Sequence, residues 1–185
     1  TPPISPSPIE GLTTYKMKFS LVALMPAIAA SSICPSSPVH MHAGCSVEVS
    51  TSADCTTART EIYARINGQY EAWHDPHNNG TYSVLSDDTA SGGVLSLQRL
   101  TGDGKYTDKI NFSFTDSDSG CSLSGCSESQ VNSIADFSTN YCNQRMLYCG
   151  EADGCHPVDA DLGAVETNVD PNFGSSSDAS ACLVV

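Results

Sequence analysis

Cysteine content constrains this chain more than any other feature of its sequence. Nine cysteines occur among 185 residues, a density typical of proteins that fold in an oxidising compartment. No two of them form a Cys-x-x-Cys pair, so a zinc site is disfavoured. We therefore predict four disulfides and one cysteine that stays unpaired or bonds to a second chain, drawn from the set Cys34, Cys45, Cys55, Cys121, Cys126, Cys142, Cys149, Cys155 and Cys182.

The identity of the odd cysteine and the pairing of the other eight are not fixed by spacing. Cys34 and Cys182 are our first candidates for the odd cysteine, because each lies near an end of the expected mature chain.

Residues 17–30 have the layout of a secretory signal peptide. They begin with Met17 and Lys18, continue as an apolar run and end in small residues suited to signal peptidase. We interpret residues 1–16, which are rich in Pro, Ser and Thr, as a leader that the native protein lacks; the alternative is a genuine Pro-rich extension. Residues 31–185 are then predicted to form one secreted, extracellular, disulfide-rich domain, in which no apolar run reaches the length of a membrane span.

Acidic residues outnumber basic residues by 21 to 8, which gives a formal net charge of −13. So few Lys and Arg cannot form the basic patch that nucleic-acid binding requires. An anionic membrane surface would repel the chain for the same reason. We expect neither kind of partner.

Residues 45–115 contain several runs in which apolar and polar side chains alternate, which predicts antiparallel strands in a sheet or a sandwich. The strongest local signal is Asn67-Gly68 within residues 60–73. Asn-Gly between two β-prone runs predicts a hairpin with a type I′ turn.

The composition changes after this block. Ser127 followed by Gln130 has the form of a capping box, and apolar residues then recur at a spacing near 3.6 residues. We predict a short, disulfide-stapled helical segment over about residues 127–149 and an extended C-terminal tail from about residue 150. The predicted fold class is α+β, mostly β, with extended tails.

Two Asn-x-Ser/Thr sequons, at Asn79 and Asn111, predict N-linked glycans. Asn79 follows strong turn-forming residues and is expected in a loop. Asn111 lies in a strand whose alternation places Ile110 and Phe112 on the opposite face. Its side chain is therefore expected to be directed away from the apolar side of the sheet.

Tyr63, Tyr70 and Trp73 lie close together in the predicted hairpin and form a candidate ligand face for a sugar or a neighbouring protomer. The alternative is a sheet covered on both sides. His74 and His77 are weak candidates for metal ligands, because the proline between them prevents the helix that would make them converge. A turn is the preferred interpretation there, and we expect no metal and no cofactor.

No nucleophile elbow, metalloprotease motif or phosphate loop is present in the sequence. Catalytic residues are therefore not predicted, and the chain is not expected to be an enzyme.

Three runs have a distinctive amino-acid sequence: WHDPHNNGTY at residues 73–82, TGDGKYTDK at 101–109, and DFSTNYCN at 136–143 with LYC at 147–149. Together they resemble uncharacterised secreted, cysteine-rich proteins of diatoms and other microbial eukaryotes, such as oomycetes. The resemblance spans roughly residues 45–185 and carries no known activity. By analogy it implies a protomer of an extracellular coat or filament.

We therefore expect a glycosylated extracellular structural or assembly protein that self-associates, with polymerisation through tails that add to a neighbour's sheet edge. The alternative is a secreted carbohydrate- or small-ligand-binding module.

Overall fold

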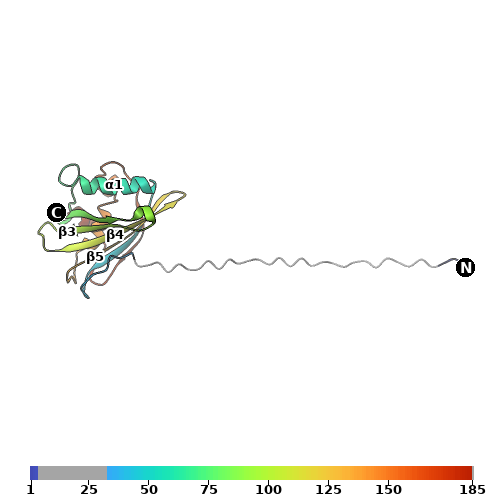
Figure 1. Ribbon diagram of the computed structural model, residues 1–185, viewed down its shortest axis with the longest axis horizontal. Coiled ribbons are helices and arrows are strands. Elements are labelled where there is room, and N and C mark those ends of the chain that lie inside the picture. Colours follow the sequence, from blue (N-terminus) through green and yellow to red (C-terminus); the bar gives the residue numbers. More distant parts are fainter. Residues whose placement is uncertain (4–32, 185) are drawn as a thin grey trace. The chain divides into compact units, whose positions relative to one another are not determined.

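The computed structural model describes residues 1–3 and 33–184, and it divides the chain into two units, residues 1–30 and 31–185. Beyond its first three residues, the predicted leader lies outside the described residues, as does the predicted signal peptide at 17–30. The second unit carries all the helices and strands described below (Figure 1). Within the described ranges, every helix is too short or too polar to traverse a lipid bilayer.

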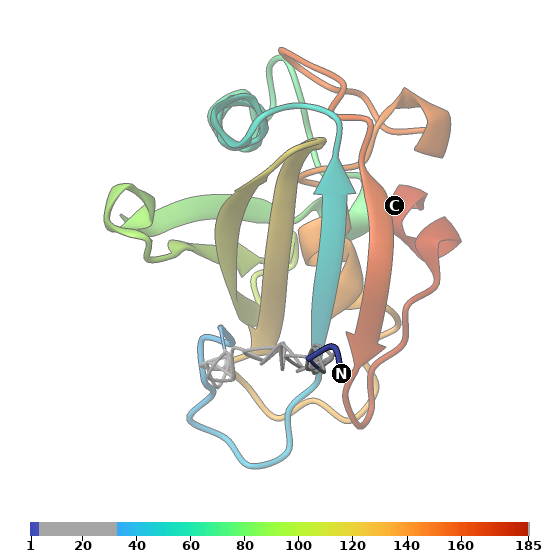
Figure 2. The ribbon, with the colours of Figure 1, turned by 90° about the vertical axis from the view of Figure 1, so that its right-hand side faces the viewer.

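Six antiparallel strands form one sheet with the spatial order β2-β3-β4-β5-β1-β6. The strands β2 to β5 form a meander, and β1 lies between β5 and β6, so the first and last strands of the domain are neighbours (Figure 2). This arrangement confirms the predicted α+β class, with a single sheet in place of a sandwich among the described residues. The strands are β1 Gly44–Thr51, β2 Thr81–Asp87, β3 Leu95–Leu100, β4 Thr107–Ser117, β5 Gly120–Ser129 and β6 Val165–Pro171.

Two α-helices, α1 Cys55–Asn67 and α2 Thr139–Arg145, pack against the same face of the sheet. We call this the inner face and the opposite one the outer face. Alternation in the strands supplies the inner face with fully buried side chains from four strands, among them Val47, Leu97, Ile110, Phe112 and Leu123. Four short 3-10 helices complete the described elements: η1 His77–Asn79, η2 Thr89–Ser91, η3 Glu151–Asp153 and η4 Ala179–Leu183.

The predicted hairpin at residues 60–73 is wrong, because α1 occupies its first half. Ala58, Ile62 and Ile66 recur every four residues and are buried on one side of the helix. The Asn-Gly pair that was interpreted as a hairpin turn instead ends the helix, and the Gly68 N–H donates to the Ala64 carbonyl at 2.8 Å. The spacing of four in the apolar residues outweighs the local turn signal.

The predicted helical segment at residues 127–149 is correct only in its second half. Ser127 belongs to β5, where it pairs with Ile110 of β4 and Cys45 of β1. Its backbone is therefore engaged in the sheet and does not begin a helix. The helix α2 starts twelve residues later, at Thr139.

Four disulfides hold the described domain together, which confirms the predicted number and indicates folding in an oxidising compartment. Three of them join residues that are 92, 66 and 40 positions apart, and the fourth closes a loop of 6. The pairs are Cys34–Cys126, Cys55–Cys121, Cys142–Cys182 and Cys149–Cys155.

Cys45 is the free cysteine, so the expectation that Cys34 or Cys182 is the odd one is wrong. Cys45 lies on the inner face of β1, opposite Ser127 of β5, and only 2% of its surface is exposed. Burial raises the pKa of its thiol to about 12. A buried, protonated thiol is poorly suited to an intermolecular disulfide.

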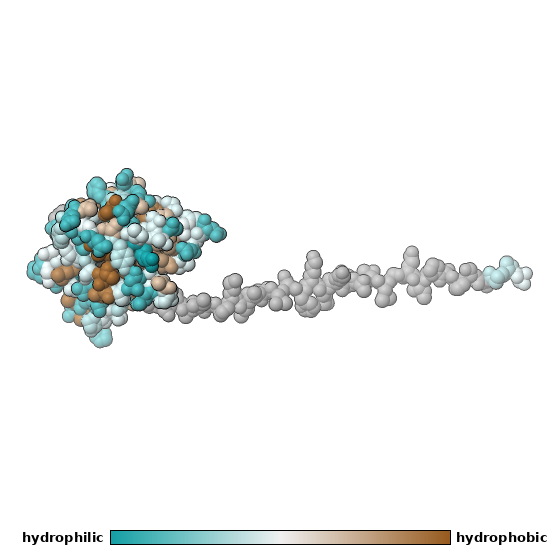
Figure 3. Space-filling model, turned by 45° about the horizontal axis from the view of Figure 1, so that its top comes forward, coloured by the Kyte–Doolittle hydropathy of each residue, from teal (hydrophilic) through white to brown (hydrophobic). Residues whose placement is uncertain are grey.

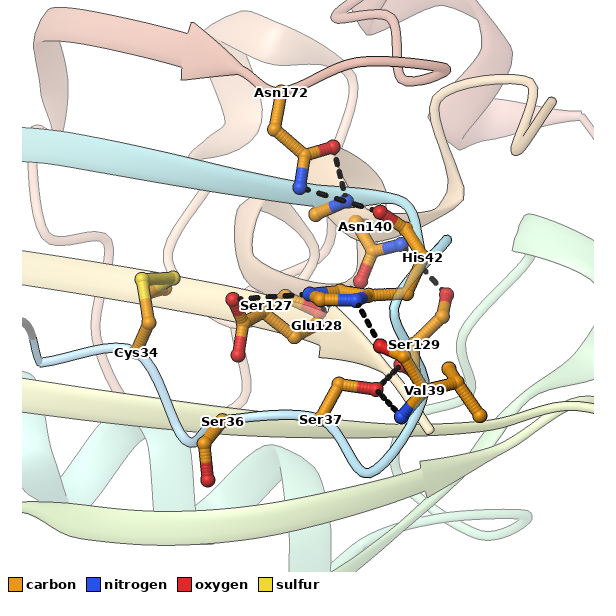
Figure 4. A network of polar contacts seen from close by, with 12 residues as sticks. Cys34, Ser36, Ser37, Val39, His42, Ser127, Glu128, Ser129, Asn140 and Asn172 are labelled. Atoms are coloured by element: carbon orange, nitrogen blue, oxygen red, sulfur yellow. Dashed lines mark hydrogen bonds and ion pairs between the residues drawn. A yellow bond between two sulfur atoms is a disulfide. The ribbon is translucent and has the colours of Figure 1, made fainter. Parts of the chain in front are cut away.

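Residues 33–42 cross the outer face of the sheet (Figure 4). Besides the disulfide of Cys34, the Ser37 hydroxyl donates to the Ser129 carbonyl at 2.7 Å, and His42 lies 3.4 Å from Glu128. The C-terminal segment, which was expected to be an extended tail, contains β6 and η4 and is bonded to α2 by the disulfide of Cys182. Both end segments are therefore attached to the domain's own sheet and helices.

Candidate functional site

Four polar side chains form a row across one end of the inner face, which we call the polar row. Tyr82 of β2, Arg99 of β3, Asp108 of β4 and Ser129 of β5 are direct cross-strand neighbours. Each is exposed by 5% or less. Buried polar groups are costly unless they are hydrogen-bonded, so the partners of this row define the local structure.

Arg99 is held by the segment that connects α1 to β2. Its Nε donates to Asp75 Oδ2 at 2.8 Å, and its Nη2 donates to Asn78 Oδ1 at 3.0 Å and to the His77 carbonyl. Gly80 leaves no room for a Cβ atom beside the guanidinium. The Nη1 group is buried without a hydrogen-bond partner in the described part of the chain.

Asp75 and His77 connect this segment to the rest of the domain. Asp75 accepts the Tyr82 hydroxyl at 2.9 Å, and burial together with that carboxylate raises the pKa of Tyr82 well above its ordinary value. The His77 ring lies 2.9 Å from the Ala181 carbonyl and 3.1 Å from the Thr139 hydroxyl. Burial lowers the pKa of His77, so the imidazole is neutral. It links η4, through Ala181, to α2, through Thr139.

Two asparagines of α2 complete the hydrogen bonding of the polar row. Asn143 Nδ2 donates to Asp108 Oδ2 at 2.8 Å and to Ser127 Oγ at 3.1 Å. Asn140 Nδ2 donates to Ser129 Oγ at 3.0 Å. These contacts fix the position of the helix over the strands, while Asn143 Oδ1 is buried without a partner among the described residues.

Two carboxylates lie at the end of this network. Burial of Asp108 raises its pKa above the ordinary value, although hydrogen bonds to the carboxylate oppose the effect. Asp136, at 7% exposure, accepts the backbone N–H groups of Ser138 at 3.2 Å and Asn140 at 3.0 Å just before α2. Neither carboxylate forms an ion pair with any described Lys, Arg or His.

Asp108 and Asp136 line a groove of about 550 Å³ between the β3–β4 loop and residues 132–139. Three large side chains stand at its rim with high exposure: Tyr106 at 47%, Ile134 at 64% and Phe137 at 79%. Ala135, the carboxylate residue Asp103 and several hydroxyl or amide residues complete the lining; these last are Asn78, Thr101, Ser129, Asn132, Ser133 and Thr139.

The size and lining of the groove are those of a small-molecule site. Ligand pockets typically measure roughly 300–1,000 Å³ and combine apolar surface with a few convergent polar groups. Here the polar groups are held in position by the buried network, and the apolar groups are those exposed at the rim. This groove is the candidate functional site.

Most of the lining comes from the three runs of residues 73–82, 101–109 and 136–149 that are distinctive in the sequence. Residues 73–82 contribute Asn78, residues 101–109 contribute both Tyr106 and Asp108, and the run that begins at residue 136 contributes Asp136 and Phe137. Runs that are far apart in the sequence thus meet at one place on the domain.

The predicted aromatic ligand face is not formed. Tyr63 lies on α1, half-buried, with its hydroxyl donating to Asp87 at 2.8 Å. Trp73 is 4% exposed and packs against the ring of Tyr82, whereas Tyr70 is 72% exposed. The face was derived from strand pairing, and α1 replaces that pairing.

The two sequons differ in accessibility. Asn79 ends η1 and is exposed, close to its predicted place in a loop. Asn111 lies on the outer face of β4, as predicted, but it is only partly exposed: its Nδ2 donates to the Ile33 carbonyl at 2.8 Å, and its Oδ1 accepts the Ser96 hydroxyl. Asn79 is therefore the more accessible acceptor.

His74 is exposed and His77 is buried, so the structure does not bring the two predicted metal candidates into one site. Among the described residues, the only potential ligand atoms gathered as a group of three belong to Cys34, Cys126 and Glu128. The two sulfurs of that group are bonded to each other and cannot act as thiolate ligands.

Sequence reasoning missed the polar row and the groove, although a signal for the row was present. In β4 the alternation that places Ile110 and Phe112 on the inner face also places Asp108 there, two residues earlier. In β3 the same alternation places Arg99 on the inner face together with Leu97. An acid and a base at inward positions of neighbouring strands indicate a buried polar site.

The chain matches no family model, no curated protein and no solved structure.

Proposed function

We propose that this protein is a secreted binding module that holds a small polar ligand, such as a short carbohydrate, in the groove at the end of the polar row. The observation that carries the proposal is the groove itself. Exposed Tyr106 and Phe137 lie beside hydrogen-bonding groups that the buried network orients. Aromatic rings that pack on sugar carbons, with polar groups for the hydroxyls, suit a carbohydrate.

Secretion and glycosylation form part of the proposal. The four disulfides indicate an oxidising compartment, and the signal-peptide layout of residues 17–30 supports export. Exposed Asn79 is the preferred acceptor for an N-linked glycan. Peptide mapping after enzymatic deglycosylation of the secreted protein tests this part of the proposal.

The binding proposal is tested with a glycan array followed by titration calorimetry on the full chain expressed through a secretory pathway. We expect a saturable signal that is lost in Tyr106→Ala and reduced in Phe137→Ala. Two exposed aromatic residues outside the groove lining provide matched controls, Tyr70→Ala at 72% exposure and Phe173→Ala at 82%. Equal loss in all four variants, or no saturable binding, would contradict the proposal.

Self-assembly into a filament or coat, the resemblance-based expectation, is a second candidate function. One observation favours it: β2 lies at an edge of the sheet and carries exposed Val84 and Leu85, and an exposed apolar edge strand is a template for pairing with another chain. The face in Figure 3 shows hydrophobic residues in separate groups among hydrophilic ones.

The route through exchanged tails is less favourable than the route through β2. Both end segments are already bonded within the domain by Cys34–Cys126 and Cys142–Cys182. Light scattering with negative-stain microscopy tests assembly: β2 pairing predicts a mass of at least two chains that falls to the mass of one chain in Leu85→Lys. A monomer at high concentration would exclude this function.

A further inference from the structure

We infer that the groove selects a ligand carrying a positively charged amine, an amino sugar in preference to a neutral or acidic sugar. This inference rests on the proposed function, because it names the ligand class for the same groove.

The lining is acidic and contains no basic side chain. It includes Asp103, Asp108 and Asp136, and no Lys, Arg or His. The Asp103 carboxylate is already paired with Lys105, whose Nζ lies 3.0 Å away. That leaves Asp108 and Asp136 as two carboxylates with no cationic ion-pair partner among the described residues.

The buried cation on the neighbouring strand offsets this pair only in part, because its charge lowers the pKa of Asp108 while burial still leaves that pKa raised. Arg99 is the cross-strand neighbour of Asp108, but its ion pair is with Asp75, at 2.7 Å. The groups that bond to Asp108 and Asp136 are neutral amides, hydroxyls and backbone N–H groups. A cation bound in the groove would therefore be the ion-pair partner that Asp108 and Asp136 lack among the described residues.

The rim suits the same kind of ligand. Tyr106 and Phe137 are exposed and line the same groove as the two carboxylates, and an ammonium over an aromatic face gains cation–π attraction. The amide of Asn132 and the hydroxyl of Ser133 belong to lining residues and can bond to sugar hydroxyls. An acidic sugar would meet only like charge here, in a chain whose net charge is −13.

The test compares four probes by titration calorimetry on the intact secreted protein: the β-1,4-linked disaccharide of glucosamine, its N-acetylated form, cellobiose and a glucuronate disaccharide. We expect the amino disaccharide to bind about tenfold or more tightly than the two neutral sugars, with no binding of the acidic one. Raising the salt concentration should weaken only the amino disaccharide.

Single substitutions test whether the Asp108 carboxylate is responsible for the preference for an amine. Asp108→Asn should reduce the affinity for the amino disaccharide about tenfold, a clearly larger loss than for the two neutral disaccharides. Asp116→Asn removes the same charge at an exposed position outside the lining and is the matched control. If Asp108→Asn fails to fold, Tyr106→Leu provides the second test, because it removes the ring without changing the charge.

The outcomes separate the two proposals. Equal binding of charged and neutral disaccharides, lost together in Tyr106→Leu, would overturn the selectivity for amines and leave the groove as a carbohydrate site. Tight binding of the glucuronate disaccharide would also overturn it. If no probe binds at millimolar concentration, both this inference and the proposed carbohydrate function fail.

Discussion

The domain contains two fully buried arginines, Arg65 on α1 and Arg99 on β3, and the two sites are built differently. All three side-chain nitrogens of Arg65 have partners: Nε donates to Glu61 at 2.7 Å, Nη1 to the Met146 carbonyl at 2.9 Å and Nη2 to the Cys149 carbonyl at 2.8 Å. Arg99 leaves Nη1 without a partner in the described structure. Every side-chain nitrogen of Arg65 is therefore hydrogen-bonded, whereas Arg99 keeps one donor group without a partner.

The surroundings show the same contrast. Glu61, the partner of Arg65, also accepts the backbone N–H groups of Val158, Asp159 and Ala160 at 2.7–2.9 Å, so it holds the C-terminal segment against α1. The row that contains Arg99 ends in an open groove. A fully satisfied buried ion pair supports folding, and an unsatisfied buried donor requires another explanation. The Arg99 site therefore retains hydrogen-bonding capacity that folding alone does not use.

Replacing Arg99 with Ala gives the largest expected effect, because it leaves the Asp75 carboxylate buried without its cation. Breaking a buried pair by removing one partner costs about 3–5 kcal/mol. Urea unfolding measures the loss. Lys105→Ala breaks an ion pair at the surface and should leave the midpoint nearly unchanged. A loss in Arg99→Ala as small as in this control would show that Arg99 is not an essential part of the fold.

Removing the disulfide that fixes the start of α1, by Cys55→Ala with Cys121→Ala, tests how much the Arg65 region depends on covalent closure. The bond joins residues 66 positions apart, and we expect a loss of about 2–4 kcal/mol. Cys149→Ala with Cys155→Ala opens a loop of only 6 residues and should cost less, by the chain-entropy argument. Thermal unfolding of both double variants decides the order, and the reverse order would contradict the entropic account.

Glu61→Gln is expected to cost about 2 kcal/mol at pH 7, since it replaces hydrogen bonds to a charged acceptor. Burial opposes ionisation of Glu61, but the N–H groups and Arg65 prevail, so its pKa lies below the ordinary 4.5. The stabilisation is therefore complete above pH 4.5 and is lost as the pH falls through the lowered pKa. Unfolding curves between pH 3 and pH 7 should show the difference from wild type shrinking at the acid end. A constant difference would refute the assignment.

Asp108→Asn gives the smallest expected effect, and in the opposite direction. Because burial raises the pKa of Asp108, ionising it costs stability in the folded protein. The variant should match wild type below pH 3.8, the ordinary value, and become slightly more stable as the pH rises through the raised pKa. The same unfolding series measures this gain. A loss of stability at pH 7 would mean that the ionised carboxylate supports the fold.

The β-sheet was predictable from the sequence to the extent that alternation alone specifies it. Ile110, Phe112 and Asn111 lie on the faces that period two assigned to them. Helix α1 was not predicted, because Asn67-Gly68 is a strong turn signal and its role as a helix end depends on packing of the preceding residues. The position of β1 between β5 and β6 depends on contacts remote in sequence, which no local pattern encodes.

The candidate site was less predictable than the sheet. Tyr63, Tyr70 and Trp73 were grouped by a pairing that does not exist, whereas the groove forms where loops from separate parts of the chain meet. Phe137, an exposed residue of the lining, has a left-handed backbone with φ of 50°. That conformation is rare for an aromatic residue, and it cannot be derived from residue type.

The path of residues 33–42 over the outer face has a practical consequence for work with this domain. The disulfide of Cys34 places this end of the domain on the side of the sheet opposite the helices and the polar row. A carrier, a surface or a fluorescent label joined at residue 33 would leave the groove facing solvent. Immobilised domain should therefore capture ligand as well as free domain does, which makes this end the natural point of attachment for a sensor.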